Sequence, residues 1–331
     1  MSRCLSAPIG ILDEHPEWSA RLIAELEHRR LPYEKIDHSS HGFDPRDRAQ
    51  RYSVIVNRTS PSSHRRGHGG VLFYAEALLA RWESLGVPVI NPVAAYRFEK
   101  SKALQIGLFE RLGINYPRTF VVNHRDQVLK ASAELRFPIL VKPNIGGSGA
   151  LIERFDTRGE LEARAAGLDF GPDGVALVQE LIESEDGAIV RVEVLADRYL
   201  YAIRIVRPAS AFNLCPADIC RLPEAPLPEA PPSAELGACP VEAKPGLQVS
   251  RYDAPPAVIE QARALARGAS IDVGGIEYLV GREDGRVYFY DVNATSNFVA
   301  NAPEVLGFDP FPPFADYIVR VATRGTRPTS A

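Results

Sequence analysis

The chain is poor in cysteine and has no long apolar run, and both absences exclude classes of protein. Only four of its 331 residues are cysteines, and their spacing matches no zinc-binding pattern. Reduced thiols are therefore expected rather than a disulfide scaffold. No stretch of about 18 consecutive apolar residues could cross a membrane, and the N-terminal residues lack the apolar core of a signal peptide. We expect a cytoplasmic protein without a membrane partner.

A basic excess is also missing. The formal net charge is −4, whereas a general nucleic-acid binder usually carries a surplus of lysine and arginine. Hydrophobic residues make up 45% of the chain and charged residues 24%, which is ordinary for a globular protein. A chain of this length exceeds one compact core, so we expect two or three lobes and no nucleic-acid partner.

What is present is a glycine-rich loop within FPILVKPNIGGSGALI, residues 137–152. An apolar strand ends at Lys142 and Pro143. The lysine supplies a positive charge that suits phosphate. Glycines let backbone N–H groups approach an anionic oxygen closely. The spacing is not that of a Walker loop, and many glycine-rich loops are ordinary hairpin turns. The candidate phosphate-binding residues of this loop are Gly146, Gly147, Ser148 and Gly149.

A second signal lies in VYFYDVNATSNF, residues 287–298. Asp291 and Asn293 are two apart on a predicted strand, so their side chains leave the same face. The preceding apolar run carries Glu277, and an Asp-Gly turn signal joins the two runs into a hairpin. Pairing would bring Glu277 close to Asp291, which gives three oxygen ligands suited to Mg²⁺. The alternative is that Glu277 meets an arginine, because a buried carboxylate needs a cation or a partner.

Strand and helix signals alternate at the start of the chain. Strands are predicted within APIGILDE, YEKID, YSVIVN and VPVIN, and helices at residues 16–30 and 73–86. This alternation indicates a parallel α/β layer with helices on its faces. The basic loop at residues 57–70 follows the carboxyl end of a strand, where such sheets place ligands. It could bind an anionic substrate, although a solvated polar loop is favoured because charged residues are mostly exposed.

A single helix is predicted at residues 97–113, with Leu104, Leu108 and Leu112 on one face. Strands follow at PRTFVV, FPILVK and VALVQELIES, and then at AIVRVEVLA and YLYAIRIV, in which Arg191 and Glu193 share a face. The stretch at residues 222–245 is rich in proline, alanine and glutamate and is predicted to be irregular.

From about residue 91 onward these pieces occur in an order that resembles the ATP-grasp superfamily. The similarity is to the branch that holds the ribosomal-protein glutamate ligases and the amino-acid ligases of lysine biosynthesis. It rests on a lysine eleven residues before Gly113, the loop KPNIGGSGALI, the hinge LVQELI, the strand IVRVEVL and the final hairpin. The resemblance implies an α/β protein of the α+β grasp type, with a small N-terminal parallel α/β domain. Its predicted parts are that domain at 1–95, an ATP-grasp N-lobe with the glycine loop at 96–180, and a C-lobe with the metal site at 181–331.

The resemblance also implies roles for individual residues. Arg191 and Lys142 would be catalytic, with Arg191 near the transferred phosphoryl group. Mg²⁺, with Mn²⁺ as an alternative, would bind to Glu277, Asp291 and Asn293. ATP would contact Lys102, Lys142, Gly146, Gly147, Ser148, Gly149, Gln179, Glu180, Leu181, Ile182, Glu183 and Asn213.

The resemblance is weaker where the acceptor would bind. The aspartate of the family's D-I-R strand is Ile189 here, and LCPADIC replaces a small glycine-rich element. The implied activity is an ATP-dependent carboxylate–amine ligase that acts on an amino acid or peptide through an acyl phosphate. Relatives often form dimers or tetramers, so a homo-oligomer is one expectation. The alternatives are a phosphotransferase on the same fold, a non-catalytic nucleotide-binding module, and a purely structural protein.

Overall fold

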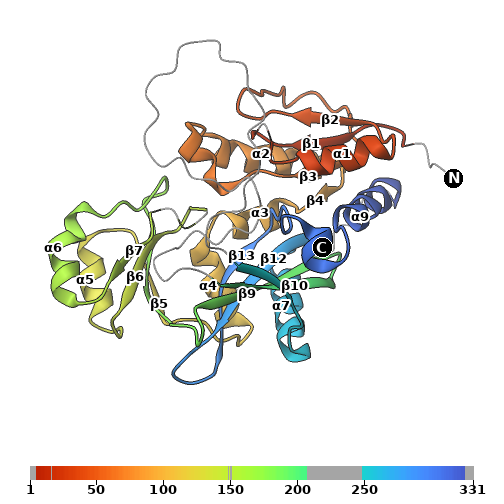
Figure 1. Ribbon diagram of the computed structural model, residues 1–331. Coiled ribbons are helices and arrows are strands. Elements are labelled where there is room, and N and C mark those ends of the chain that lie inside the picture. Colours follow the sequence, from red (N-terminus) through yellow and green to blue (C-terminus); the bar gives the residue numbers. More distant parts are fainter. Residues whose placement is uncertain (1–4, 16, 148, 150, 207–247, 325–331) are drawn as a thin grey trace, which may run out of the picture.

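The computed structural model describes residues 5–15, 17–147, 149, 151–206 and 248–324 (Figure 1). Three sheets lie in these residues, one of four parallel strands followed by two that are antiparallel. The mixed α/β architecture predicted from the sequence is therefore confirmed. Each sheet falls within one of the ranges 1–95, 96–180 and 181–331, and the boundaries themselves remain predictions.

The first sheet has the strand order β2-β1-β3-β4. Its central strands β1 and β3 are buried on both faces, which explains why they read as continuous apolar runs. Helix α1 packs against one face and α2 against the other. The elements of this part are β1 (Ile9–Leu12), α1 (Ala20–His28), β2 (Tyr33–Ile36), β3 (Val54–Asn57), the 3₁₀ turn η1 (Pro61–Arg66), α2 (Val71–Ser84) and β4 (Val89–Ile90).

The second sheet has the order β5-β8-β6-β7 and its own small core beneath α5 and α6, which lie beside it in Figure 1. Buried side chains such as Val141, Phe155 and Val178 form that core. The elements are β5 (Thr119–Val122), α5 (Asp126–Ser132), β6 (Ile139–Pro143), β7 (Glu153–Phe155), α6 (Arg158–Arg164), η2 (Ala165–Gly167) and β8 (Ala176–Glu180).

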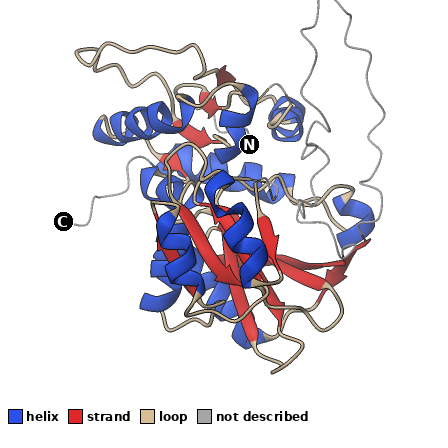
Figure 2. Ribbon diagram, turned by 90° about the vertical axis from the view of Figure 1, so that its left-hand side faces the viewer, coloured by secondary structure: helices blue, strands red, loops and turns tan. Residues whose placement is uncertain are grey.

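The third sheet has the order β11-β10-β9-β12-β13. Figure 2 shows that helices of the molecule lie in front of its strands on the side that faces the viewer. Helices α4 and α7 cover one face of this sheet and α9 the other. The elements are β9 (Ala188–Leu195), β10 (Arg198–Val206), β11 (Gln248–Tyr252), α7 (Pro256–Gly268), β12 (Val273–Val280), β13 (Val287–Asn293), α8 (Ala302–Leu306) and α9 (Phe311–Arg324). The hydrophobic core under α9 continues into the first sheet, because Leu22 and Val56 belong to the same cluster as Ile203 and Phe314.

The single helix predicted at residues 97–113 is wrong. The chain forms two helices, α3 (Val93–Glu99) and α4 (Lys102–Arg111), separated at Ser101. Ser101 is extended and its hydroxyl accepts from the N–H of Leu104, so it caps α4 and gives that helix a new direction. The predicted leucine face is lost as a result, since Leu104 is 47% exposed and only Leu108 of the three is buried.

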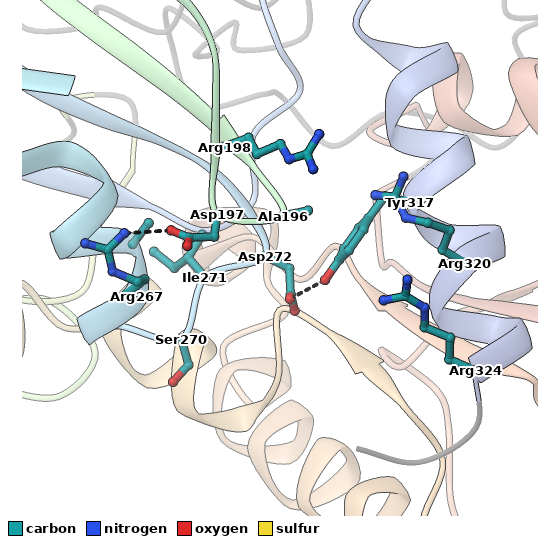
Figure 3. A pocket seen from close by; sticks show the side chains of 11 residues that line it. Ala196, Asp197, Arg198, Arg267, Ser270, Ile271, Asp272, Tyr317, Arg320 and Arg324 are labelled. Carbon is teal, nitrogen blue, oxygen red and sulfur yellow. Dashed lines mark hydrogen bonds and ion pairs between the residues drawn. The ribbon is translucent and has the colours of Figure 1, made fainter. Parts of the chain in front are cut away.

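A buried asparagine joins the first and third sheets. Asn91 has no exposed surface and lies in the left-handed region, with φ of 54°. Its side chain donates to the carbonyls of Val273 (2.8 Å) and Ala294, and accepts from the N–H groups of Asp272 (2.9 Å) and Val273 (3.1 Å). Asp272 in turn accepts from Tyr317 of α9, as Figure 3 shows. These contacts fix the link between the sheets.

Among the helices in the described ranges, none combines the length and the apolar character that crossing a membrane requires.

Replacing Asn91 with alanine should destabilise the fold by about 3 kcal/mol, because buried backbone groups would lose their partners. The midpoint of chemical unfolding measures this loss. The Asn91→Gly variant is the matched comparison, since glycine removes the same bonds but tolerates the positive φ. We expect it to be the more stable of the two, and a loss below about 1 kcal/mol in both variants would contradict the role given to Asn91.

Candidate functional site

The hairpin of β12 and β13 has the predicted pairing. Glu277 lies opposite Asp291 and Gly275 opposite Asn293. The register then shifts, so that Tyr278 pairs with Phe289 and Tyr290 is an extra residue in its strand. Two carboxylates and an amide therefore gather at one end of the hairpin.

Two lysines approach this end from other elements. Lys102, the first residue of α4, places its Nζ 3.3 Å from Asp291 Oδ1. Lys142 lies in β6 and is buried, and burial together with the nearby charge of Lys102 lowers its pKa to about 8. The charges of Asp291 and Glu277 act on Lys142 in the opposite direction, so Lys142 lies within electrostatic reach of the other three groups.

The charges also set the ionisation of the acids. Burial alone would raise the pKa of Asp291, but Lys102 and Lys142 outweigh it and hold the pKa below its ordinary value. Burial raises the pKa of Glu277, and the neighbouring charge of Asp291 adds to the rise against the opposing effect of Arg191. Asp291 is therefore the carboxylate that stays ionised most readily.

Asn144, which the sequence analysis did not single out, ties the glycine loop to α4. Its Oδ1 accepts from the hydroxyl of Ser101 (3.1 Å) and from the N–H of Ala103 (2.8 Å). Its Nδ2 donates to Asp173 Oδ2 at 2.7 Å. Lys102 lies between Ser101 and Ala103 in sequence. The contacts of Asn144 with these two residues therefore hold Lys102 in position. An asparagine directly after a lysine-bearing strand is too common a pattern to have revealed this.

The glycine loop lies against the first part of the molecule. A Cβ on Gly147 would come within 3.3 Å of the Cβ of Ser62 in η1, so a larger residue would crowd this approach. Gly149 has φ of 72°, a conformation that favours glycine. Gly146 lies in the same described stretch, whereas Ser148 and Asn213 lie outside the residues that the structure describes.

The predicted hinge uses its side chains for structural contacts. Gln179 is buried and donates to the hydroxyl of Thr119 at 2.7 Å. Glu180 accepts from the backbone N–H of Arg136 at 3.0 Å. Leu181 donates its N–H to Pro138, Ile182 is half-buried, and Glu183 forms an exposed ion pair with Arg282. Base recognition by the main chain of these residues remains a prediction.

Arg191 occupies the centre of a buried charge network. Its Nε donates to Glu193 Oε1 (2.6 Å) and its Nη1 to Glu277 Oε1 (2.8 Å). Its Nη2 donates to the hydroxyl of Ser296 at 3.2 Å. Burial would lower the pKa of Arg191, but Glu193 and Glu277 outweigh that effect and raise it. The arginine partner considered for Glu277 is therefore present.

The three predicted metal ligands have unequal freedom to accept a cation. Both oxygens of Glu277 have partners, the second being the hydroxyl of Tyr290 at 3.0 Å. Asp291 Oδ1 is buried and, apart from the Lys102 ammonium, has no hydrogen-bonding partner. Asn293 donates its amide N–H to Asp291 Oδ2 (3.3 Å), which leaves its amide oxygen for a cation. In the described part of the chain, no cluster of three or more His, Cys, Asp or Glu side chains is arranged for a metal. The set of hard oxygen donors nevertheless fits Mg²⁺, provided that Glu277 exchanges a partner.

The basic loop after β3 is not simply solvated, which corrects the expectation favoured from the sequence. Arg58 is only 2% exposed and reaches from the first sheet to the loop after β13. Its Nη1 donates to the carbonyl of Ser296 at 2.7 Å, and its Nη2 to the side chain of Asn297. Ser296 also donates to Glu193 at 2.8 Å, so Arg58 joins the network of Arg191. The position of Arg58 at the carboxyl end of a parallel strand pointed to a ligand-binding loop but not to these contacts.

A separate cavity of about 550 Å³ opens beyond the carboxyl end of β9 (Figure 3). Asp197, Asp272 and Tyr317 contribute to its wall, and four arginines surround it: Arg198, Arg267, Arg320 and Arg324. Arg267 pairs with Asp197 at 2.9 Å. None of the predicted site residues lines this cavity, so it lies outside the candidate site.

Comparisons with solved structures identify the fold. The ATP-grasp ligase PsnB, solved with a phosphomimetic variant of its minimal precursor, Mg and ADP, superposes with a TM-score of 0.67 at 19% identity. This match covers 96% of the present chain and all of PsnB. D-alanine–D-alanine ligase from Bacillus anthracis gives 0.63 at 16% identity, covering 96% and 98% of the two chains. The chain therefore has the ATP-grasp fold, as the sequence predicted.

Sequence comparison finds curated relatives that are named as probable alpha-L-glutamate ligases. A probable alpha-L-glutamate ligase of Vibrio vulnificus is 26% identical over 155 residues, which is 46% of this chain and 48% of that protein. The match thus spans about half the length of this and several other curated relatives. No protein-family model matches the chain. The resemblance to glutamate ligases noted in the sequence is confirmed.

The pKa of Lys142 should make nucleotide affinity depend on pH. Its ammonium is charged below pH 8 and is lost as the pH rises through about 8. The dissociation constant for Mg–AMPPNP should therefore rise above that pH, by up to about tenfold per unit. Calorimetric titrations between pH 7 and 10 measure the slope. Lys142→Ala should bind more weakly but lose this dependence, and an equal slope in both proteins would contradict the assignment.

Proposed function

We propose that the protein is an ATP-dependent carboxylate–amine ligase, which forms an amide or peptide bond through an acyl phosphate. One observation carries the proposal: Lys102 and Lys142 converge on Asp291 and Glu277 from separate elements. Ammonium groups and carboxylates gathered in this way suit a triphosphate with a divalent cation. The ATP-grasp fold and the similarity to proteins named glutamate ligases support the same assignment.

In the proposed reaction the chain mainly binds and orients its substrates. Lys102 and Lys142 would hold the phosphates of ATP, and the backbone N–H groups at Gly146, Gly147 and Gly149 would cover them. The substrate carboxylate attacks the γ-phosphorus to give an acyl phosphate and ADP. The amine then attacks the acyl carbon, and phosphate leaves with the electron pair of the broken C–O bond.

Glu277, Asp291 and Asn293 would hold the divalent cation, Mg²⁺ or Mn²⁺, which neutralises negative charge on the phosphates during transfer. Lys102 would then exchange its contact with Asp291 for the phosphate. Arg191 lies between Glu277 and Glu193, beside the metal ligands, and would stabilise the anionic oxygens of the acyl phosphate. Exclusion of water by the glycine loop would protect that species from hydrolysis.

The substrates proposed are an amino acid and either a second amino acid or a peptide. This choice is supported by the names of a sequence relative, a probable alpha-L-glutamate ligase, and of a structural neighbour, D-alanine–D-alanine ligase. A cytoplasmic location and assembly into a homo-oligomer belong to the same proposal.

Release of phosphate from ATP tests the activity directly. The purified protein is incubated with Mg–ATP and pairs of amino acids or peptides, and mass spectrometry identifies the product. Lys142→Ala and Asp291→Asn should both lower turnover by about 10²-fold or more, because each removes a charge from the phosphate site. Lys130→Ala, a change at an exposed lysine, serves as the matched control and should keep full activity.

Three outcomes would contradict the proposal. Turnover in Lys142→Ala or Asp291→Asn equal to that of the parent protein would remove these residues from the site. A stable phosphorylated product formed without an amine would identify a phosphotransferase. Binding of nucleotide without any phosphate release would identify a non-catalytic module.

A further inference from the structure

Strand β13, which carries Asp291 and Asn293, lies at the edge of the third sheet. Among the described strands it pairs only with β12, so the backbone groups along its other edge need different partners. Val292 lies between the two predicted metal ligands and is 1% exposed, so bulk solvent does not supply these partners. Whatever holds Val292 therefore also holds the backbone from which both ligands extend.

Gln105 of α4 supplies both partners of Val292. Its Nε2 donates to the carbonyl of Val292 at 2.9 Å, and its Oε1 accepts from the N–H of Val292 at 3.1 Å. Nε2 also donates to the carbonyl of Phe98, near the end of α3, at 2.9 Å. Gln105 is itself only 1% exposed. A neutral amide that bonds to the N–H and the C=O of one residue takes the place of a neighbouring strand at that residue.

Helix α4 therefore holds the metal-bearing strand at two points. Lys102 and Gln105 are three residues apart and lie on the same face of α4. Lys102 contacts the carboxylate of Asp291 at 3.3 Å, and Gln105 bonds to the main chain of the next residue. In the proposed reaction Lys102 exchanges Asp291 for a phosphate, whereas the bonds of Gln105 involve no group that would bind a ligand. These bonds can therefore stay intact while nucleotide and cation bind and leave.

We infer that Gln105 is a positioning residue for the divalent cation. It fixes the main chain of Asp291 and Asn293 relative to Lys102, so that the oxygen ligands of the cation and a phosphate-binding group keep one spacing. The inference rests on the proposed ligase function and deepens it, because it names a residue that sets the affinity for the cation without contacting it. Residues that orient metal ligands typically account for about 10- to 100-fold in metal affinity.

Glu99 of α3 continues this support beyond Asn293. Its carboxylate accepts from the N–H of Ala294 and, at 2.7 Å, from the hydroxyl of the threonine that follows. Gln105 and Glu99 thus hold the chain on both sides of Asn293. Glu99 is also a carboxyl group within electrostatic reach of Asp291, whereas Gln105 is neutral. An apolar substitution at Gln105 therefore removes backbone support and leaves the charges of the site unchanged.

Calorimetric titration of the full chain with AMPPNP in three buffers, containing EDTA, Mg²⁺ or Ca²⁺, tests the inference. Gln105→Met keeps the length of the side chain but removes its hydrogen bonds. It should bind AMPPNP in EDTA within about twofold of the parent protein, because both phosphate-binding lysines remain. In Mg²⁺ it should bind at least about tenfold more weakly than the parent. The loss in Ca²⁺ should be smaller, since Ca²⁺ tolerates irregular ligand geometry and Mg²⁺ does not.

Two further variants control for effects on folding. Gln105→Ser leaves room for a water molecule to partner the backbone groups of Val292, so it should fold yet lack a fixed anchor, and it should show the same pattern. Gln127→Met is the matched control, because it removes an exposed glutamine that also bonds to a backbone N–H, at 3.0 Å. It should match the parent in all three buffers. The midpoint of chemical unfolding is measured for every variant.

The outcomes separate the inference from the proposed function. Failure of the parent protein to bind AMPPNP in any buffer would refute the proposed function itself. With a parent that binds, equal weakening of the Gln105 variants in EDTA, Mg²⁺ and Ca²⁺ overturns the inference, because the residue would then support the fold in general. It is also overturned if both Gln105 variants bind like the parent in Mg²⁺, or if neither of them folds.

Discussion

The ion pair between Lys102 and Asp291 is the contact on which the arrangement of the candidate site depends. Both charges are largely withdrawn from water, and neither would be stable there alone. The same alternation continues through Glu277, Arg191 and Glu193, each placed beside an opposite charge. The candidate site is thus made of paired opposite charges. An arriving triphosphate and cation can exchange partners with these groups instead of creating new buried charges.

The periodic parts of this arrangement could be predicted from the sequence. Strand alternation and an Asp-Gly turn were enough to bring Glu277 close to Asp291, but the extra residue at Tyr290, which places the two directly opposite each other, was not predicted. The shared face of Arg191 and Glu193 followed from the same two-residue period and appears as a direct contact. The order of the glycine loop, the lysines and the acidic hairpin was enough to indicate the fold.

Contacts between distant segments could not be predicted. Ser101 interrupts what reads as one amphipathic helix, since a serine can cap a helix or lie exposed within one, and packing decides between them. Arg58 reads as part of a polar loop, and its partners lie more than two hundred residues away in the chain. Asn144 lacks any pattern of its own. Such residues are fixed by tertiary structure, which hydrophobic periodicity does not encode.

The continuity of one hydrophobic core has a mechanical consequence. Side chains from the first and third sheets, such as Val56 and Ile203, pack in a single cluster, whereas the second sheet has a separate core and adds Leu177 to the cluster under α4 and α7. Separating the first sheet from the third would expose that shared apolar surface, while tilting the second would not. The second sheet is therefore the part of the molecule whose tilt can change with the smaller loss of buried apolar surface, while the first and third sheets stay packed together.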